Sequence, residues 1–196
     1  NKGFALATGE VVSWLNGDDL YYAHTLARIQ AAMDKSTEAA MFFGGCPIID
    51  EQGLEIRSNI TRFKEFFYPL SSRFTYQCIN YISQPALFFR RSVVEKVGPI
   101  RQDMQAAWDY EFILRMWRYG PARRISGEPL AAFRWHEQSI SGTHFHTQFQ
   151  EEFEAAKKDA GPWSPQTGLH FLVHWGIIAI YSAMSAIRGS SHQDTG

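Results

Sequence analysis

The chain has 196 residues, of which 45% are hydrophobic and 20% charged, a composition that excludes an intrinsically disordered protein. Its length is sufficient for one domain with a hydrophobic core. The formal net charge is −1, so a broad basic surface for nucleic acid is not expected. Cys46 and Cys78 form no metal or redox spacing, which favours a reducing, cytoplasmic location.

The first residues predict a short helix or turn, Asn1–Gly9, that ends at a glycine. The sequence there has neither an initiator methionine nor a signal peptide. The strand that follows needs neighbours in its sheet, and few residues precede it. We therefore expect the chain to be a fragment that lacks an N-terminal part.

A buried strand is predicted at Glu10–Leu15, and it leads directly into the acidic loop Asn16-Gly17-Asp18-Asp19. Ligands of open α/β sheets bind outside the carboxyl ends of the strands, where this loop would lie. Two adjacent carboxylates repel each other unless a cation lies between them. The motif indicates either a divalent-metal site for a phosphorylated ligand or a solvated turn, and by itself it supports both equally.

Helical and strand patterns alternate along the rest of the chain, as is typical of an α/β protein. The segment Thr61–Tyr81 is rich in aromatic residues, which indicates core packing or, as the second choice, a wall that faces a substrate. Helices are expected at His24–Lys35, from a capping box Ser92–Glu95, after Asp109 and within Ser141–Ala160. Strands are expected at Ala40–Ile49 with an interruption at Gly44-Gly45, at Leu54–Ser58, after Gln84-Pro85 within Ile82–Phe89, at Ala122–Ile125 and at Leu130–Phe133.

Asp109 precedes a helix whose apolar face includes Phe112 and Met116. It could cap that helix, since aspartate is among the best N-caps. It could also serve as a general base, because helix amide groups near it favour the ionised carboxylate that a base requires. Glu111 is the rival carboxylate. Further along the chain, His136 could be a metal ligand or a phosphate contact, although its spacing alone favours a surface residue.

Leu169–Ile187 contains no Asp, Glu, Lys or Arg and has an apolar stripe of helical period. It is about as long as the roughly 20 residues that a bilayer span requires. His170 and His174 lie on the opposite face, which favours a helix that lies on a membrane or packs on a partner. A core helix is the alternative, and the tail 189–196 is expected to be disordered.

Four segments together resemble the family 2 glycosyltransferases, which have the GT-A fold. The resemblance runs from Asn1 to about Ser141. It implies a Rossmann-like mixed sheet flanked by helices, without the first strands that hold the nucleotide in this family. The segments are NKGFALATGEVVSWLNGDD, SQPALFFRRSVVEKVGPI, AWDYEFILRMWRYG and FRWHEQSIS.

The resemblance also implies roles for individual residues. Asp19, with Asp18 beside it, would hold Mn²⁺ or Mg²⁺ on the diphosphate of a nucleotide-sugar, and His136 could add a ligand. Asp109 would take the proton from the acceptor hydroxyl in a single displacement that inverts the anomeric configuration. The residues expected near the donor or acceptor are Asn16, Gln84, Trp108, Glu111 and Arg134.

No Gln-x-x-Arg-Trp motif is present, which favours transfer of a single sugar over processive synthesis. The expected acceptor is a lipid-linked or cell-surface glycan, with the enzyme in the cytoplasm at the inner face of the membrane. Residues 1–143 would form the C-terminal part of the GT-A domain and 144–188 a helical extension that contacts a membrane or partner. The alternatives are a metal-dependent phosphohydrolase, and an inactive fragment or glycan-binding module.

Overall fold

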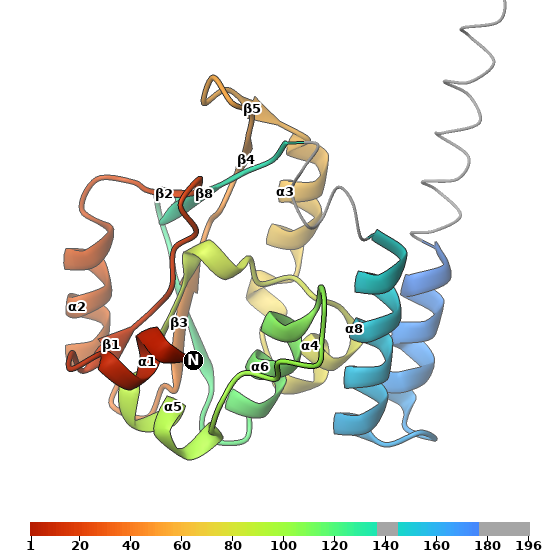
Figure 1. Ribbon diagram of the computed structural model, residues 1–196. Coiled ribbons are helices and arrows are strands. Elements are labelled where there is room, and N and C mark those ends of the chain that lie inside the picture. The colour runs from red at the N-terminus through yellow and green to blue at the C-terminus, as the bar shows by residue number, and fades with distance from the viewer. Residues whose placement is uncertain (137–144, 177–196) are drawn as a thin grey trace, which may run out of the picture.

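The computed structural model describes residues 1–136 and 145–176, which form two small mixed sheets with helices around them (Figure 1). In the first sheet β3 lies parallel to β7 and antiparallel to β6, and in the second β8 lies parallel to β4 and antiparallel to β2. The expected mixed α/β architecture is thereby confirmed. The strand order is β1 (Val11–Val12), β6 (Leu87–Arg90), β3 (Met41–Gly44), β7 (Ala122–Ile125) in one sheet and β2 (Leu20–Tyr21), β8 (Ala131–Arg134), β4 (Ile48–Ile49), β5 (Glu55–Ile56) in the other.

Helices cover both faces of the first sheet. The side chains of β3 alternate between the two faces, so each face offers apolar groups to a helix. Phe42 packs with Ile29 and Met33 of α2 on one face, whereas Met41 and Phe43 join the larger cluster on the other. The helices are α1 (Lys2–Leu6), α2 (Thr25–Lys35), α3 (Ser58–Phe66), α4 (Arg73–Cys78), α5 (Arg91–Val97), α6 (Trp108–Met116) and α8 (Phe145–Ala160), with 3-10 turns η1 (Tyr68–Leu70) and η2 (Gln84–Ala86).

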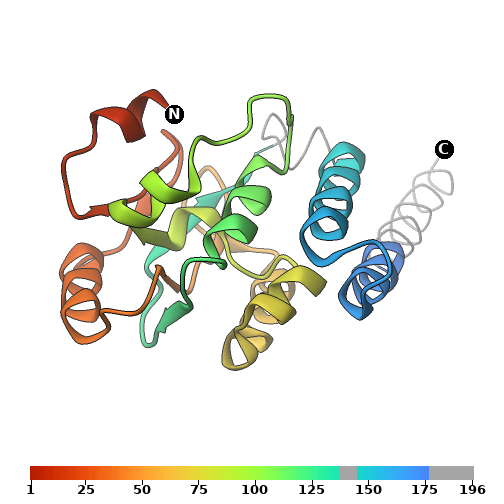
Figure 2. The same ribbon diagram turned by 90° about the horizontal axis from the view of Figure 1, so that it is seen from below.

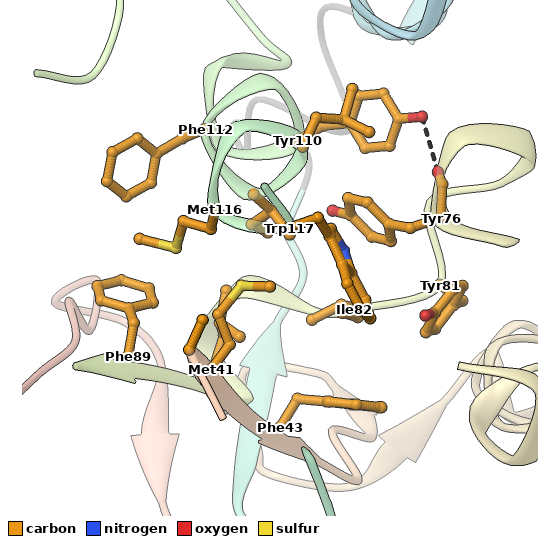
Figure 3. Packing of buried hydrophobic residues seen from close by; sticks show 14 of the residues in the cluster. Met41, Phe43, Tyr76, Tyr81, Ile82, Phe89, Tyr110, Phe112, Met116 and Trp117 are labelled. Atoms are coloured by element: carbon orange, nitrogen blue, oxygen red, sulfur yellow. Dashed lines mark hydrogen bonds between the residues drawn. The ribbon is translucent and has the colours of Figure 1, made fainter. Parts of the chain in front are cut away.

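The larger cluster joins side chains of α4 and α6 to those of β3 and β6, and many of its members are aromatic (Figure 3). Tyr110 of α6 donates its hydroxyl to the carbonyl of Tyr76 at 2.8 Å, so the two helices are joined by a hydrogen bond inside the core. The aromatic segment expected at 61–81 divides between core and surface. Its tyrosines, Tyr68, Tyr76 and Tyr81, are buried, whereas Phe63, Phe66 and Phe74 are exposed.

Three local expectations are wrong. The first strand is shorter than predicted, and α1 ends at Leu6 with Ala7 as its C-cap, so Gly9 does not terminate it. The capping box at Ser92 does not form. Helix α5 starts two residues earlier than the box requires, at Arg91 with Arg90 as N-cap, and Glu95 binds the Arg91 guanidinium at 2.7 Å.

Helix α8 packs against α4 and α6, and it contributes buried Ala155 and Ala156 to the larger cluster (Figures 1 and 2). Its Asp159 carboxylate accepts hydrogen bonds from Arg73 and Gln77 of α4 on one oxygen, at 3.0 and 2.8 Å. The other oxygen accepts two from Arg118, just after α6. The structure therefore joins α8 to the helices that cover the sheet.

A helix over residues 165–176 follows α8 and places a polar side chain in the core. His170 is buried, and its Nδ1 donates to the Gln77 carbonyl at 2.9 Å. Leu169, Leu172 and Trp175 are exposed, so part of the apolar stripe faces away from the protein. Within the described ranges 1–136 and 145–176, no helix is long and apolar enough to cross a membrane, and 177–187 of the predicted Leu169–Ile187 helix lie outside those ranges.

Replacing Asp159 with Asn should destabilise the fold. The change removes the charge that pairs with two arginines, and each arginine is partly solvated, so we expect the free energy of unfolding to fall by about 1–3 kcal/mol. Urea unfolding measures the change. Glu95→Gln breaks a solvent-exposed pair and should cost less than about 0.5 kcal/mol; equal losses in the two variants would contradict the role of Asp159.

Candidate functional site

The acidic loop forms a turn in which the Asp19 amide donates to the Asn16 carbonyl at 3.2 Å. The Asp19 side chain is buried, with the residue only 8% exposed. One of its oxygens accepts from Asn16 Nδ2 and the other from the Arg134 amide, each at 2.9 Å. Burial raises the pKa of the Asp19 carboxyl above its ordinary value, although these two hydrogen bonds oppose the shift.

The other carboxylate of the acidic loop, Asp18, lies beside His136, which follows the end of β8. Its Oδ2 lies 3.2 Å from His136 Nε2, and both side chains are partly exposed. Arg134, the last residue of β8, holds the loop in place, because its Nε donates to the Asp18 carbonyl at 2.9 Å and its Nη1 donates to the carbonyls of Asp50 and Glu51. The structure thus brings the predicted Asp18, Asp19, Arg134 and His136 together. Arg134 uses its backbone and guanidinium to hold the loop, and its contact with a ligand stays a prediction.

Gln84 connects the acidic loop to the first sheet. It is buried in η2, donates from Nε2 to the Trp14 carbonyl at 2.6 Å, and accepts from Asn16 Nδ2 at 3.3 Å. The Trp14 ring in turn contacts the Trp108 ring, with 5.3 Å between their centroids. This chain of contacts runs from Asn16 in the acidic loop through Gln84 and Trp14 to Trp108 at the start of α6.

Asp109 lies in the first turn of α6 and does not cap it, because the N-cap residue is Ala107. Its Oδ1 accepts a hydrogen bond from the Tyr110 amide at 2.8 Å. Burial raises the pKa of the Asp109 carboxyl, while the Tyr110 amide and the positive charge of Lys64 lower it. Asp109 is half-buried, and a carboxyl with a raised pKa that a ligand can still reach is suited to accept a proton near neutral pH.

Glu111, the rival carboxylate, binds Arg115 one turn later at 3.0 Å. Arg115 also donates to the carbonyls of Val97 and Pro99, at 2.7 and 2.9 Å. These bonds fix the loop between α5 and α6, and Glu111 is engaged in them through Arg115.

Two charged residues near Asp109 were not predicted from the sequence. Lys64 of α3 donates to Ser83 Oγ at 3.2 Å, and Glu152 of α8 is buried and accepts from Asn80 Nδ2 at 3.0 Å. The Asp109 charge adds to the burial that raises the pKa of Glu152, whereas Lys64 lowers that pKa. No motif marks either residue, since both are charged residues on helices that would ordinarily face solvent.

The residues of the acidic loop and His136 fit a metal ion that is held partly by the protein and partly by the phosphates of a bound nucleotide. Within the described residues, no group of three His, Cys, Asp and Glu side chains could hold a metal by itself. Asp18 and His136 nevertheless offer a carboxylate and an imidazole at one partly exposed point. Mg²⁺ in nucleotide sites is typically bound by one or two carboxylates together with substrate phosphates, and an imidazole also suits Mn²⁺.

Asp19 should make the fold more stable in acid relative to neutral pH. Because its pKa is raised in the folded state, its protonated form is favoured there, and stability is lost as pH rises above its ordinary value of 3.8. The Asp19→Asn variant has no carboxyl there and does not lose this stability. The unfolding free energy of the variant should therefore rise relative to that of the wild type between about pH 4 and pH 7. Urea unfolding at both pH values tests this.

Asp34→Asn on the exposed face of α2 controls for the loss of one negative charge. If the difference between Asp19→Asn and the wild type shrank as pH rose, the burial of an ionised carboxylate at Asp19 would be contradicted.

Known proteins of similar structure include TarS of S. aureus. Its residues 1–349 in complex with UDP match 82% of this chain and 43% of that one with a TM-score of 0.56 at 14% identity. The complex with UDP-GlcNAc matches 79% of this chain and 45% of that one, also at a TM-score of 0.56 and with 15% identity. At this level of identity the likeness shows a shared GT-A fold.

Sequence relatives give the same classification. An uncharacterized glycosyltransferase of Nostoc sp., alr2836, is 29% identical over 163 residues, 82% of this chain and 49% of the relative. The O-antigen biosynthesis protein RfbC of Myxococcus xanthus is 28% identical over 116 residues, 59% of this chain and 8% of the relative. The chain thus spans about half or less of the length of these relatives. Residues 1–98, half of the 196, match the family described as glycosyl transferase family 2, and the chain belongs to that family.

Proposed function

We propose that the protein is an inverting, metal-dependent glycosyltransferase that moves one sugar from a nucleotide-sugar donor to a hydroxyl of the acceptor. The observation that carries the proposal is the arrangement of two carboxylate centres. The acidic loop with Asp18 and Asp19 is joined through Gln84 and the Trp14–Trp108 contact to the helix turn that bears Asp109. One centre suits a metal-bound diphosphate and the other suits proton abstraction.

Asp19 and Asp18, together with His136, are the residues that would hold Mn²⁺ or Mg²⁺. When bound, the ion neutralises the negative charge that develops on a leaving nucleoside diphosphate. Asn16 and Arg134 keep the loop in place through the hydrogen bonds to Asp19 and Asp18. UDP is the first nucleotide to test, because the structures of TarS with a similar fold contain UDP and UDP-GlcNAc.

Asp109 acts as the general base. Its carboxylate accepts the proton of the acceptor hydroxyl, and the hydroxyl oxygen attacks the anomeric carbon as the bond to the diphosphate breaks. One displacement from the opposite face inverts the configuration. The hydrogen bond from the Tyr110 amide holds the carboxylate in a fixed orientation, which favours an aligned proton transfer.

The proposed acceptor is a cell-surface or lipid-linked glycan, and the proposed location is the cytoplasmic side of a membrane. The RfbC relative is named for O-antigen biosynthesis, which supports this class of acceptor. The exposed Leu169, Leu172 and Trp175 of the helix over 165–176 would provide apolar surface for a peripheral contact. Contact through the whole of Leu169–Ile187 and the division into 1–143, 144–188 and 189–196 stay predictions.

Glycan binding without transfer is the second candidate function. It is favoured by the exposed rings of Phe63, Phe66 and Phe74, which lie on α3 and α4. Aromatic rings stack on flat apolar faces of ligands. Such binding would be insensitive to metal and would survive replacement of Asp19.

The donor site is tested by thermal shift of the intact protein with UDP, GDP or dTDP, with and without Mn²⁺. We expect one nucleotide to stabilise the protein only when Mn²⁺ is present, by about 2.7 kcal/mol at a concentration of 100 times its Kd. Asp19→Ala should abolish most of this stabilisation. Stabilisation that is independent of metal and unchanged in Asp19→Ala would contradict the assignment.

The base is tested by Asp109→Asn. The amide keeps the shape of the side chain but cannot take a proton, so transfer should fall by about 10²–10⁴-fold, whereas the Kd of the metal–nucleotide complex should change little. Glu111→Gln is the matched control in the same helix turn and should retain most of the activity. Transfer at the wild-type rate in Asp109→Asn would show that another residue is the base.

A further inference from the structure

Helix α6, which bears the proposed base, begins without a side chain of its own that can cap it. Its N-cap residue is Ala107, which makes no capping hydrogen bond through its side chain. The first amides of a helix and of the turn before it need partners, and an uncapped helix start is usually less stable by about 0.5–2 kcal/mol.

Glu151 of α8 supplies partners for the amides of the turn before α6 from a distant part of the chain. Its Oε1 accepts from the Gln105 amide at 2.8 Å, and its Oε2 accepts from the amides of Ala106 and Ala107, each at 2.9 Å. Burial by itself would raise the pKa of Glu151, but the three amides lower it below its usual value. One carboxylate therefore fixes three consecutive residues directly ahead of α6.

We propose that Glu151 is a positioning residue for Asp109, and this inference rests on the proposed role of Asp109 as the base. Asp109 lies two residues after the last amide that Glu151 holds. Its carboxylate is oriented by the Tyr110 amide of the same turn, so its position follows the backbone there. A displacement of about 1 Å at a reacting group is enough to lower a rate about 100-fold.

The chemistry of the contact requires a carboxylate. Glutamate presents two acceptor oxygens to three donors. Glutamine would turn an NH₂ group towards at least one amide N–H, which places two donors against each other. Aspartate keeps both oxygens but is one methylene shorter.

Asp159, on the same helix, offers a matched control. It also uses a carboxylate to join α8 to its neighbours, but its partners are Arg73, Gln77 and Arg118. None of these bonds involves residues 105–109. Asp159→Asn therefore weakens the attachment of α8 without removing a contact to the turn before the base.

The experiment compares Glu151→Gln, Glu151→Asp and Asp159→Asn in the intact protein, at a temperature where all are folded. Turnover is followed as nucleoside diphosphate release from UDP-GlcNAc, GDP-mannose and dTDP-rhamnose, with a lipid extract of the source cells as acceptor. We expect Glu151→Gln to lower kcat about 10- to 100-fold with the donor KM within about 2-fold. Glu151→Asp should restore part of the loss, and Asp159→Asn should keep kcat near the wild-type value.

Amide hydrogen exchange provides a second readout that needs no substrate. Exchange at residues 105–110 should be faster in Glu151→Gln than in the wild type and unchanged in Asp159→Asn. Unchanged exchange there in Glu151→Gln would overturn the proposal, and so would equal losses of kcat in Glu151→Gln and Asp159→Asn. Asp109→Asn in the same turnover assay separates the role of the base from the role of Glu151. If Asp109→Asn turned over normally, the proposed base would be wrong. If Asp109→Asn were inactive and Glu151→Gln fully active, only the role of Glu151 would be refuted.

Discussion

The buried carboxylate of Asp19 is the constraint on which the rest of the site depends. A carboxylate out of water is costly unless donors surround it, and here the donors come from two distant segments, the Asn16 side chain and the Arg134 backbone. Satisfying Asp19 therefore brings the end of β8 onto the acidic loop. The same arrangement places His136 beside Asp18, which assembles a metal-binding edge from residues far apart in sequence.

A second constraint fixes the distance between this edge and the base. Gln84 holds the Trp14 carbonyl, and Trp14 packs on Trp108 at the start of α6. Helix α8 then secures the other side of that turn through Glu151 and packs Glu152 close to Asp109. Contacts of Gln84 and Trp14 on one side and of Glu151 on the other thus connect the two carboxylate centres to the body of the fold.

Local patterns in the sequence predicted much of this structure, because hydrophobic period and turn residues report on neighbours along the chain. The helix at Thr25–Lys35 and the strand at Ala122–Ile125 formed as expected. The grouping of Asn16, Gln84, Arg134 and His136 around the acidic loop followed from the family resemblance. The capping box at Ser92 failed because the helix already begins at Arg91, so Ser92 lies inside it and cannot be its N-cap.

The errors elsewhere have a common cause, which is that a distant segment supplied what the local sequence lacked. A cap was one of the two roles open to Asp109, but Ala107 is the N-cap of α6, and Glu151 holds the turn before the helix from 40 residues or more away. His170 was expected on an outer polar face, but it lies in the core, where its Nδ1 donates to the Gln77 carbonyl of α4. The most direct test of the whole account is a crystal structure of the intact protein with UDP and Mn²⁺. We expect Mn²⁺ on the acidic loop at Asp18 or Asp19, bound to the diphosphate, with the Asp109 carboxylate facing the same cleft; a nucleotide bound away from that loop, or a metal held by other residues, would contradict the account.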